Sequence, residues 1–322
     1  MIRVAVLDDY QDVALKMADW SVFDSCCDIT VFHDHLADEA AVAARLEPFE
    51  IICVMRERTP ITRSLMERLP LLRLICSTGK RNAAIDDTAA KERGIAVVHT
   101  GYSSDPTIEM TWALILGLVR NLVPEANSVR EGGWQIGVAG DLRGRILGVV
   151  GLGNIGGAVA RIAQAFGMEV IAWSQNLTAD KAQAAGAKLV SKEDLFAQAD
   201  IVTIHLVLSD RTRGLVDAGT LARMKPTALL VNCSRGPIVD ETALIGVLRD
   251  GRIAGAAVDV YGTEPLPADH PFRVLPNVLA TPHVGYVSEN TYRTFYGDTV
   301  RNIATWLDAE GVASAREKPS SG

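Results

Sequence analysis

The 322-residue sequence has few cysteines, no long apolar run and no excess of basic residues, and each absence excludes a class of protein. The five cysteines are odd in number and show no CxxC spacing, which indicates reduced thiols in a cytoplasmic protein. The apolar runs are too short to span a bilayer, and Asp8 and Asp9 stand where a signal peptide needs apolar residues. The net charge of −7 disfavours nucleic-acid binding, which relies on Lys and Arg. We therefore expect neither membrane nor nucleic-acid partners.

Apolar residues make up 48% of the chain and charged residues 22%, which is ample material for packed cores. At roughly 150 residues per domain, the length suggests two domains. Short apolar runs alternate with helical patterns from end to end, and this alternation predicts an α/β fold with parallel sheets. The expected strands are 4–7, 51–54, 72–76 and 95–98 in the first part, and 146–150, 169–173, 201–206, 229–233, 253–258 and 278–280 in the second.

Two long helical patterns connect these parts. Residues 107–130 are apolar-rich and interrupted by Pro124, and we expect this helix to cross from the first domain to the second. Residues 288–307 carry apolar side chains at helical spacing, and we expect this helix to return to the first domain. The chain after residue 312 is small and polar and is expected to be frayed. The predicted domains are 1–103 with 289–322, and 104–288.

A glycine-rich run, Gly151-Leu152-Gly153-Asn154-Ile155-Gly156, follows the predicted strand 146–150 and opens a helical pattern. This is GxGxxG in the context of strand, turn and helix. Gly151 permits the tight turn, Gly153 lets the backbone approach a pyrophosphate, and Gly156 allows close helix–strand packing. The helix N-terminus offers N–H groups and a partial positive charge to phosphates. The sequence therefore predicts a dinucleotide-binding site.

The residue expected to bind the ribose is unusual. In NAD-binding proteins an Asp or Glu ~20 residues beyond the loop bonds the ribose 2′-hydroxyl. Here the second strand ends at Trp173 and Ser174 occupies the place of the acid. A carboxylate would repel a 2′-phosphate and Ser174 would not, yet no Arg lies close by to bind one. We expect NADP or NAD, with NADP slightly favoured.

Three polar residues follow apolar strands in the second half of the chain. Arg235 comes after strand 229–233, Glu264 lies in the loop after strand 253–258, and His283 follows the last predicted strand. Ligands of open α/β sheets bind outside the carboxyl ends of the strands. The three residues are therefore expected where a ligand would be.

The segments NCSRGPIVDETAL, AAVDVYGTEPLP and TPHVG, together with GLGNIGG, are similar to the signatures of the D-isomer specific 2-hydroxyacid dehydrogenases. The resemblance covers essentially the whole chain. It implies a flavodoxin-like substrate domain, a Rossmann dinucleotide-binding domain, a cleft between them and a homodimer. It also implies that Arg235, Glu264 and His283 are catalytic. The cofactor-binding positions implied by the loop and by the resemblance are Gly151, Gly153, Asn154, Ile155, Gly156, Ser174, His205, Cys233, Ser234 and Asp259.

The chemistry of the three catalytic residues agrees with that resemblance. Arg235 offers a planar fork of donors that can bind a carboxylate and polarise the adjacent ketone of a 2-oxoacid. His283 can give a proton to the developing alkoxide near neutral pH. Glu264 can bond the other imidazole nitrogen, which fixes the tautomer and favours the charged form.

Candidate substrate residues lie in the first domain. Family members often bind the substrate carboxylate through N–H groups of the loop after a first-domain strand, commonly with a GxDN-like sequence. This chain has Arg81-Asn82-Ala83-Ala84 there, so a substrate role and a solvated turn remain alternatives for Lys80 and Arg81. His33-Asp34-His35 is taken as a solvated loop, and no metal is expected. The substrate-binding candidates are Arg56, Thr78, Gly79 and Arg235.

The sequence thus predicts an oxidoreductase that transfers a hydride between a nicotinamide cofactor and a small 2-oxoacid or 2-hydroxyacid, similar to glyoxylate or hydroxypyruvate reductases. A short phosphoglycerate dehydrogenase-like enzyme is an alternative. A dinucleotide-sensing binding protein of the corepressor type is another, which the short chain without a long disordered tail disfavours.

Overall fold

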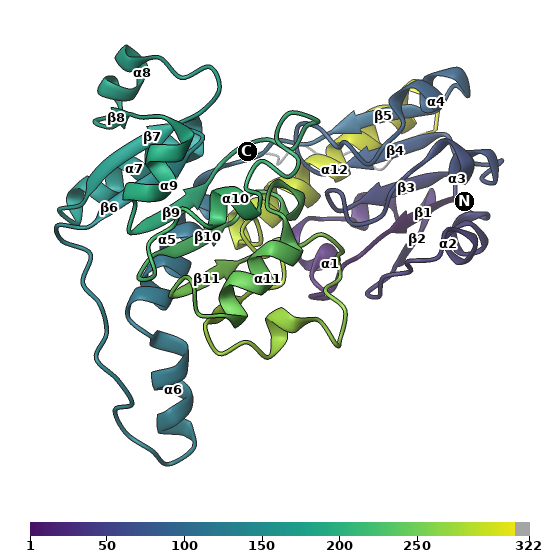
Figure 1. Cartoon of the computed structure of the whole chain (residues 1–322). Coiled ribbons are helices and arrows are strands. Elements are labelled where there is room, and N and C mark those ends of the chain that lie inside the picture. Colours follow the sequence, from purple (N-terminus) through teal and green to yellow (C-terminus); the bar gives the residue numbers. More distant parts are fainter. Residues whose placement is uncertain (313–322) are drawn as a thin grey trace, which may run out of the picture. The chain divides into compact units, whose positions relative to one another are not determined.

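The computed structural model describes residues 1–312, and the predicted frayed tail lies outside them. The chain folds into two compact units: residues 1–103 together with the chain from residue 287 on, and residues 104–286 (Figure 1). The second boundary is at 286/287, against a predicted 288/289. No helix within residues 1–312 combines the length and the apolar character that crossing a membrane requires.

The first unit is built on a five-stranded parallel sheet with the order β2-β1-β3-β4-β5. This is the flavodoxin-like order, which confirms the predicted fold class for this unit. Buried apolar strands such as β3 were predictable from composition, whereas β2 was not, because it is a half-exposed edge strand. The strands are β1 Ile2–Val6, β2 Cys27–Val31, β3 Ile51–Val54, β4 Leu74–Ser77 and β5 Ala96–His99.

Capped helices cover this sheet. Asp38, Thr62 and Asp86 each accept a backbone N–H of the first turn that follows, which is the usual role of an N-cap residue. The last helix, α12, begins after the cap Ser288 and packs on α1, β4 and β5. The helices of this unit are α1 Ala14–Met17, η1 Ser21–Phe23, α2 Glu39–Leu46, α3 Arg63–Glu67, α4 Asp87–Glu92 and α12 Glu289–Ala309.

The second unit is built on a seven-stranded parallel sheet with the order β12-β11-β10-β9-β6-β7-β8. Numbered from β6, this is the Rossmann order 3-2-1-4-5-6 with one added strand, which confirms the predicted fold. The two-residue strand β8 was not predicted. The strands are β6 Ile146–Val150, β7 Glu169–Trp173, β8 Lys188–Leu189, β9 Ile201–Ile204, β10 Leu229–Asn232, β11 Gly255–Val258 and β12 Val278–Ala280.

Helices cover both faces of the second sheet. Successive strand residues alternate between the two cores: Val149 packs in the core with residues of α5 and α7, and Val150 in the core with residues of α9, α10 and α11. A strand buried on both faces reads as a continuous apolar run, which is why these strands were recognisable. The helices besides α5 and α6 are α7 Asn154–Ala165, α8 Ala179–Ala184, α9 Lys192–Gln198, α10 Ala218–Leu221, η2 Gly236–Ile238, α11 Glu241–Arg249 and η3 Pro271–Arg273.

The long helix predicted over 107–130 is two helices, α5 Asp105–Val119 and α6 Leu122–Arg130. The break is at Asn121, which has a left-handed backbone (φ 53°), and not at Pro124 as predicted. Pro124 lies in the first turn of α6, where a missing N–H costs no helical hydrogen bond. Both helices belong to the second unit, so the prediction that this segment crosses between domains is also wrong.

Candidate active site

Five strands of the second sheet deliver polar or glycine residues to one edge. Because all strands are parallel, their carboxyl ends lie on the same side. Each of these residues lies one to three positions after the end of its strand. They are Gly151 after β6, His205 after β9, Arg235 after β10, Asp259 after β11 and His283 after β12. The order places the glycine loop at the topological switch point between β6 and β9.

The glycine loop has the shape that a dinucleotide phosphate needs. Gly151 has φ 101°, and a Cβ on it would lie 2.5 Å from the carbonyl oxygen of His205. A Cβ on Gly156 would lie 2.0 Å from the carbonyl oxygen of Gly151. The protein's own packing therefore requires both glycines. A Cβ on Gly153 would meet no protein atom within 4 Å, and Gly153 is the N-cap of the 12-residue helix α7. Open space above a helix N-terminus fits a pyrophosphate.

The end of β7 carries no carboxylate. β7 ends at Trp173, and Ser174 starts a turn in which its carbonyl oxygen accepts the N–H of Leu177 at 3.0 Å. The next acid along the chain is Asp180, in the first turn of α8. The position at which the sequence predicts ribose binding therefore holds a partly buried hydroxyl, that of Ser174.

His205 and Cys233 are uncharged at neutral pH. The backbone N–H of His205 donates to Val150 at 2.8 Å, and its Nε2 lies 2.9 Å from Thr203 Oγ1. Burial lowers the pKa of His205 to about 4, which keeps the ring neutral. Burial raises the pKa of the Cys233 thiol to about 12, so it is not a thiolate. Ser234, the next residue, donates through Oγ to the carbonyl oxygen of Leu206.

Asp259 holds the loop that carries His283. Its carboxylate accepts from Thr281 Oγ1 at 2.6 Å, Val284 N at 2.9 Å and Gly285 N at 2.8 Å. The side chain is buried, and burial raises the pKa of Asp259 while these hydrogen bonds lower it. Both oxygens are used within the protein. The contact with cofactor that the family resemblance implies for Asp259 stays a prediction.

His283 and Glu264 form a close pair. His283 Nδ1 lies 2.5 Å from Glu264 Oε2, and Glu264 Oε1 accepts the N–H of Tyr261 at 2.9 Å. The backbone of His283 is left-handed (φ 53°), and its ring meets the ring of Tyr286 edge to face at 5.5 Å between centroids. Nε2 of His283 has no hydrogen-bond partner among residues 1–312. That nitrogen is available to a ligand.

Arg235 stands at the corner where β10 turns into η2. Its Nη1 donates to the carbonyl oxygen of Ser234 at 2.9 Å, and its own carbonyl accepts from Asn232 Nδ2 at 3.1 Å. The backbone of the next residue, Gly236, lies so close to Tyr261 that a Cβ would sit 2.1 Å from its carbonyl. Tyr261 is also the residue whose N–H binds Glu264. One packed corner thus positions two of the three predicted catalytic residues.

The predicted substrate residues of the first unit contact one another. Arg56, after β3, has a left-handed backbone (φ 52°), and its N–H donates to Thr78 Oγ1 at 2.8 Å. Its Nη1 donates to the carbonyl of Thr78 at 3.2 Å and lies against Gly79, where a Cβ would be 1.8 Å away. A non-glycine residue held at positive φ after a strand is a feature that Arg56 shares with His283.

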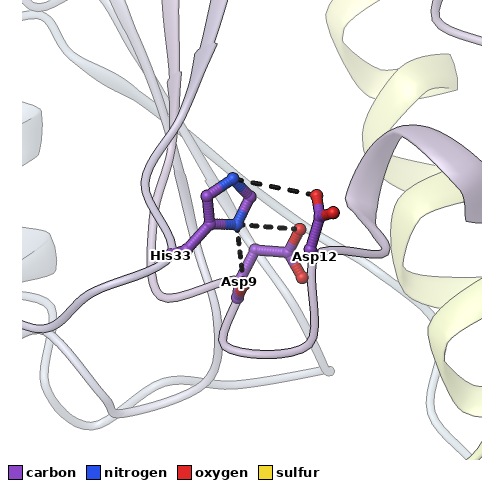
Figure 2. Close-up of side chains that lie close together, drawn as sticks. All are labelled: Asp9, Asp12 and His33. Carbon is purple, nitrogen blue, oxygen red and sulfur yellow. Dashed lines mark hydrogen bonds and ion pairs between the residues drawn. The ribbon is translucent and has the colours of Figure 1, made fainter.

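The His33 loop has acidic partners that sequence reasoning missed. His33 Nδ1 lies 3.0 Å from the carbonyl oxygen of Asp9 and 3.8 Å from Asp9 Oδ2, while Nε2 lies 3.7 Å from Asp12 Oδ1 (Figure 2). The two acids therefore meet opposite nitrogens of one ring. Asp9 also accepts the N–H groups of Val13 and Ala14, and Lys16 pairs with Asp12. These contacts hold the turn together, and one possible ligand atom from each of Asp9, Asp12 and His33 lies within 4.8 Å of the others.

Comparisons with known proteins identify the family. A model described as the NAD-binding domain of D-isomer specific 2-hydroxyacid dehydrogenases matches residues 112–285. The chain is 40% identical over 70% of its length to a glyoxylate reductase from Aeropyrum pernix, of which it covers 71%. It is 31% identical over 99% of its length to a D-3-phosphoglycerate dehydrogenase from Methanocaldococcus jannaschii, of which it covers 60%.

A solved structure described as a phosphoglycerate oxidoreductase from Vibrio cholerae o395 matches with a TM-score of 0.92 and 38% identity, over 96% of this chain and 100% of that one. The two-sheet fold agrees with these matches, and the glycine loop lies within the residues that the family model matches. The chain belongs to the D-isomer specific 2-hydroxyacid dehydrogenases, a family of NAD-dependent oxidoreductases acting on CH–OH donors.

Proposed function

We propose that this enzyme interconverts a small 2-oxoacid and its 2-hydroxyacid, with Arg235, Glu264 and His283 as its catalytic residues. The observation that carries the proposal is the His283–Glu264 pair at 2.5 Å, which leaves Nε2 of His283 without a partner among residues 1–312. An imidazole oriented by a carboxylate through one nitrogen and open at the other is the arrangement of a general acid–base.

Different residues of the second unit bind the cofactor, bind the substrate and transfer the proton. When bound, a nicotinamide dinucleotide supplies or accepts the hydride, and the loop 151–156 would hold its pyrophosphate. The guanidinium of Arg235 binds the substrate carboxylate and polarises the carbonyl. His283 gives its Nε2 proton to the carbonyl oxygen in reduction and takes it back in oxidation. Glu264 keeps the proton on Nδ1 and stabilises the charged imidazole.

Glyoxylate and hydroxypyruvate are the first candidate substrates. The match to a glyoxylate reductase supports them, and the match to a phosphoglycerate dehydrogenase supports the phosphorylated alternative. In the first unit, Arg56, Thr78 and Gly79 are proposed to contribute to substrate binding. Five free cysteines, all within residues 1–312, support a cytoplasmic location.

NADP is proposed as the preferred cofactor. The support is Ser174, a hydroxyl at the end of β7 where a carboxylate would repel a 2′-phosphate. Substitution Ser174→Asp should move preference toward NADH, measured as the ratio of kcat/KM for the two cofactors. An unchanged ratio would place ribose recognition elsewhere.

A homodimer is proposed from an apolar arm in the second unit. Residues 131–143 run back from α6, held by bonds such as Ser128 Oγ to the carbonyl of Trp134 at 2.7 Å (Figure 1). Trp134 is 74% exposed, and Ile136 and Val138 are also exposed. Exposed apolar side chains that lie close together are typical of a surface that another protein covers. A hollow of about 430 Å³, lined among others by Val123, Pro124 and Val138, lies at the base of the arm and can receive such side chains from a second copy.

The decisive experiment is a panel of 2-oxoacids assayed with NADH and NADPH in parallel. We expect turnover of glyoxylate, hydroxypyruvate or its phosphate ester at rates typical of dehydrogenases. Binding of dinucleotide without turnover of any 2-oxoacid would contradict the proposal and favour a dinucleotide-sensing binding protein.

A further inference from the structure

Three residues that can ligate a metal ion meet at the carboxyl edge of the first sheet. Asp9 and Asp12 lie in the loop between β1 and α1, and His33 lies in the segment that follows β2. One ligand atom of each residue lies within 4.8 Å of those of the other two (Figure 2). β1 and β2 are neighbouring strands of one unit, so the fold brings His33 to Asp9 although the two are 24 positions apart along the chain.

A backbone carbonyl decides which nitrogen of the neutral His33 ring carries the proton. Nδ1 lies 3.0 Å from the carbonyl oxygen of Asp9, and a carbonyl oxygen can only accept, so Nδ1 is the protonated nitrogen. Nε2 of the neutral ring is then unprotonated, and it faces Asp12 Oδ1 at 3.7 Å. Two such acceptors repel each other unless a proton or a cation lies between them. A histidine whose other nitrogen donates to a backbone carbonyl is also the usual metal-ligating form.

Asp9 supplies a carboxylate that the fold already holds in place. It is 1% exposed, and it accepts the backbone N–H groups of Val13 and Ala14, each at 2.9 Å. Two donors leave part of the roughly four lone-pair sites of a carboxylate for a further ligand. Because the side chain is fixed before a cation binds, the entropic cost of binding is low.

A buried hydroxyl near Asp9 has no partner in the protein. Tyr296, on α12, is 2% exposed, and its hydroxyl forms no hydrogen bond within residues 1–312. Burial raises the pKa of Tyr296 and the charge of Asp9 raises it further, which places the phenol close to this carboxylate. Buried polar groups are normally hydrogen-bonded. A water molecule bound to a cation at Asp9 would give this hydroxyl a partner.

Asp12 keeps one carboxylate oxygen for a cation. Lys16 binds the other oxygen, Oδ2, at 3.1 Å. The side chains of Lys16 and Asp12 are 66% and 72% exposed, and ion pairs as exposed as this contribute little to stability. The contact with Lys16 therefore leaves Oδ1 of Asp12 available on the side that faces His33.

We propose that Asp9, Asp12 and His33 bind a divalent transition-metal ion of the Zn²⁺ class, which joins the loop after β1 to the segment after β2. One imidazole and two carboxylates are ligands that Zn²⁺ accepts, whereas Mg²⁺ prefers oxygen ligands alone. The inference does not depend on the proposed function, since no step of that chemistry uses these residues.

The spacing of the ligand atoms is compatible with tetrahedral zinc. With bonds of about 2.1 Å, such an ion holds its ligand atoms about 3.4 Å apart. The 3.7 Å between His33 Nε2 and Asp12 Oδ1 is close to this value. Both side chains are at least half exposed, so they can rotate toward the fixed carboxylate of Asp9 when the ion binds.

Titration of the metal-free, full-length protein with ZnCl₂, followed by isothermal titration calorimetry, tests the inference. The test variants are His33→Gln and Asp12→Asn, each of which removes one exposed ligand. Asparagine tolerates the left-handed backbone of residue 12 (φ 53°). The matched controls are His99→Gln and Asp28→Asn, which change an exposed histidine and an exposed aspartate of the same unit.

We expect one Zn²⁺ per parent chain. Its Kd should rise at least ~10-fold in each test variant and less than ~2-fold in each control, because losing a ligand costs no less than losing an outer-shell contact. Zn²⁺ at about a hundredfold excess over Kd should raise the thermal unfolding midpoint of the parent by roughly 5 °C, since only the folded chain holds the three ligands together. MgCl₂ should produce neither effect.

Parent-like Zn²⁺ affinity in either test variant would overturn the inference, and would be the result if a thiol such as Cys26 held the metal. Equal losses in test and control variants, no Zn²⁺ binding by the parent, or Mg²⁺ binding as tight as that of Zn²⁺ would also overturn it. Because both substituted side chains are exposed, the metal-free variants should keep the parent's unfolding midpoint. A loss of affinity then reports on the ligand and not on folding.

Discussion

At the scale of single residues, the first prediction concerns Arg235. Arg235→Ala should lower kcat/KM for a 2-oxoacid by at least ~100-fold, about 3 kcal/mol of transition-state binding, because the carboxylate loses its bidentate donor. Arg235→Lys should recover only part, since an ammonium cannot reproduce the planar fork. Steady-state kinetics of the three proteins check this. Parent-like kinetics of the alanine variant would remove Arg235 from the site.

The His283–Glu264 pair allows a matched comparison at the same scale. Glu264→Gln keeps a hydrogen-bonding partner for Nδ1 but removes the charge, and kcat/KM should fall ~10-fold; Glu264→Ala removes both and should cost ~100-fold or more. The second unit holds another such pair, Glu241 Oε1 with His270 Nε2 at 3.2 Å. Glu241→Gln is the control and should stay within ~2-fold of the parent. Equal effects of the Glu264→Gln and Glu241→Gln substitutions would mean that Glu264 acts only on structure.

At the scale of elements, His205, which follows β9 beside β6, should make the folding stability of the protein depend on pH. Burial lowers the pKa of His205 to about 4, from an ordinary 6.5 in the unfolded chain. Between these values the unfolded chain binds a proton that the folded chain does not, so folding stability falls as pH drops from 6.5 toward 4, by at most about 3 kcal/mol. His205→Gln should flatten this part of the stability curve. Urea unfolding of both proteins at pH 4.5 and 7.5 measures it, and identical pH dependence would contradict the assignment.

At the scale of the whole molecule, the arm at 131–143 predicts the oligomeric state. Trp134→Glu places a charge at a large exposed apolar position and should convert a dimer to monomers, because an unpaired charge in a buried interface is strongly unfavourable. Val274, 81% exposed after η3, gives the control substitution Val274→Glu. Light scattering after size-exclusion chromatography at micromolar concentration reports the mass. A parent protein that is already monomeric would refute the homodimer.

Local features of the sequence were sufficient for the fold class and for the residues of the glycine loop. Strands buried on both faces read as apolar runs, and their order along the chain with helices between them predicts parallel sheets. The residues that follow each strand are then expected at one edge, and the structure places Gly151, Arg235 and His283 there. These predictions depend only on the residues that are close to one another along the chain.

Contacts between distant segments were decided by the tertiary structure alone. Asp259 accepts from Thr281, Val284 and Gly285, and His33 meets Asp9 and Asp12, yet no sequence pattern links these partners. The helix break at Asn121 was missed because a left-handed backbone does not change the apolar pattern of the sequence. Pro124 was taken as the break, but in the first turn of a helix a proline costs no helical hydrogen bond. The two sets of contacts, of Asp259 and of His33, share one physical reason. Periodicity records which face of an element is buried, and it does not record which polar atoms of other segments complete the hydrogen bonds there.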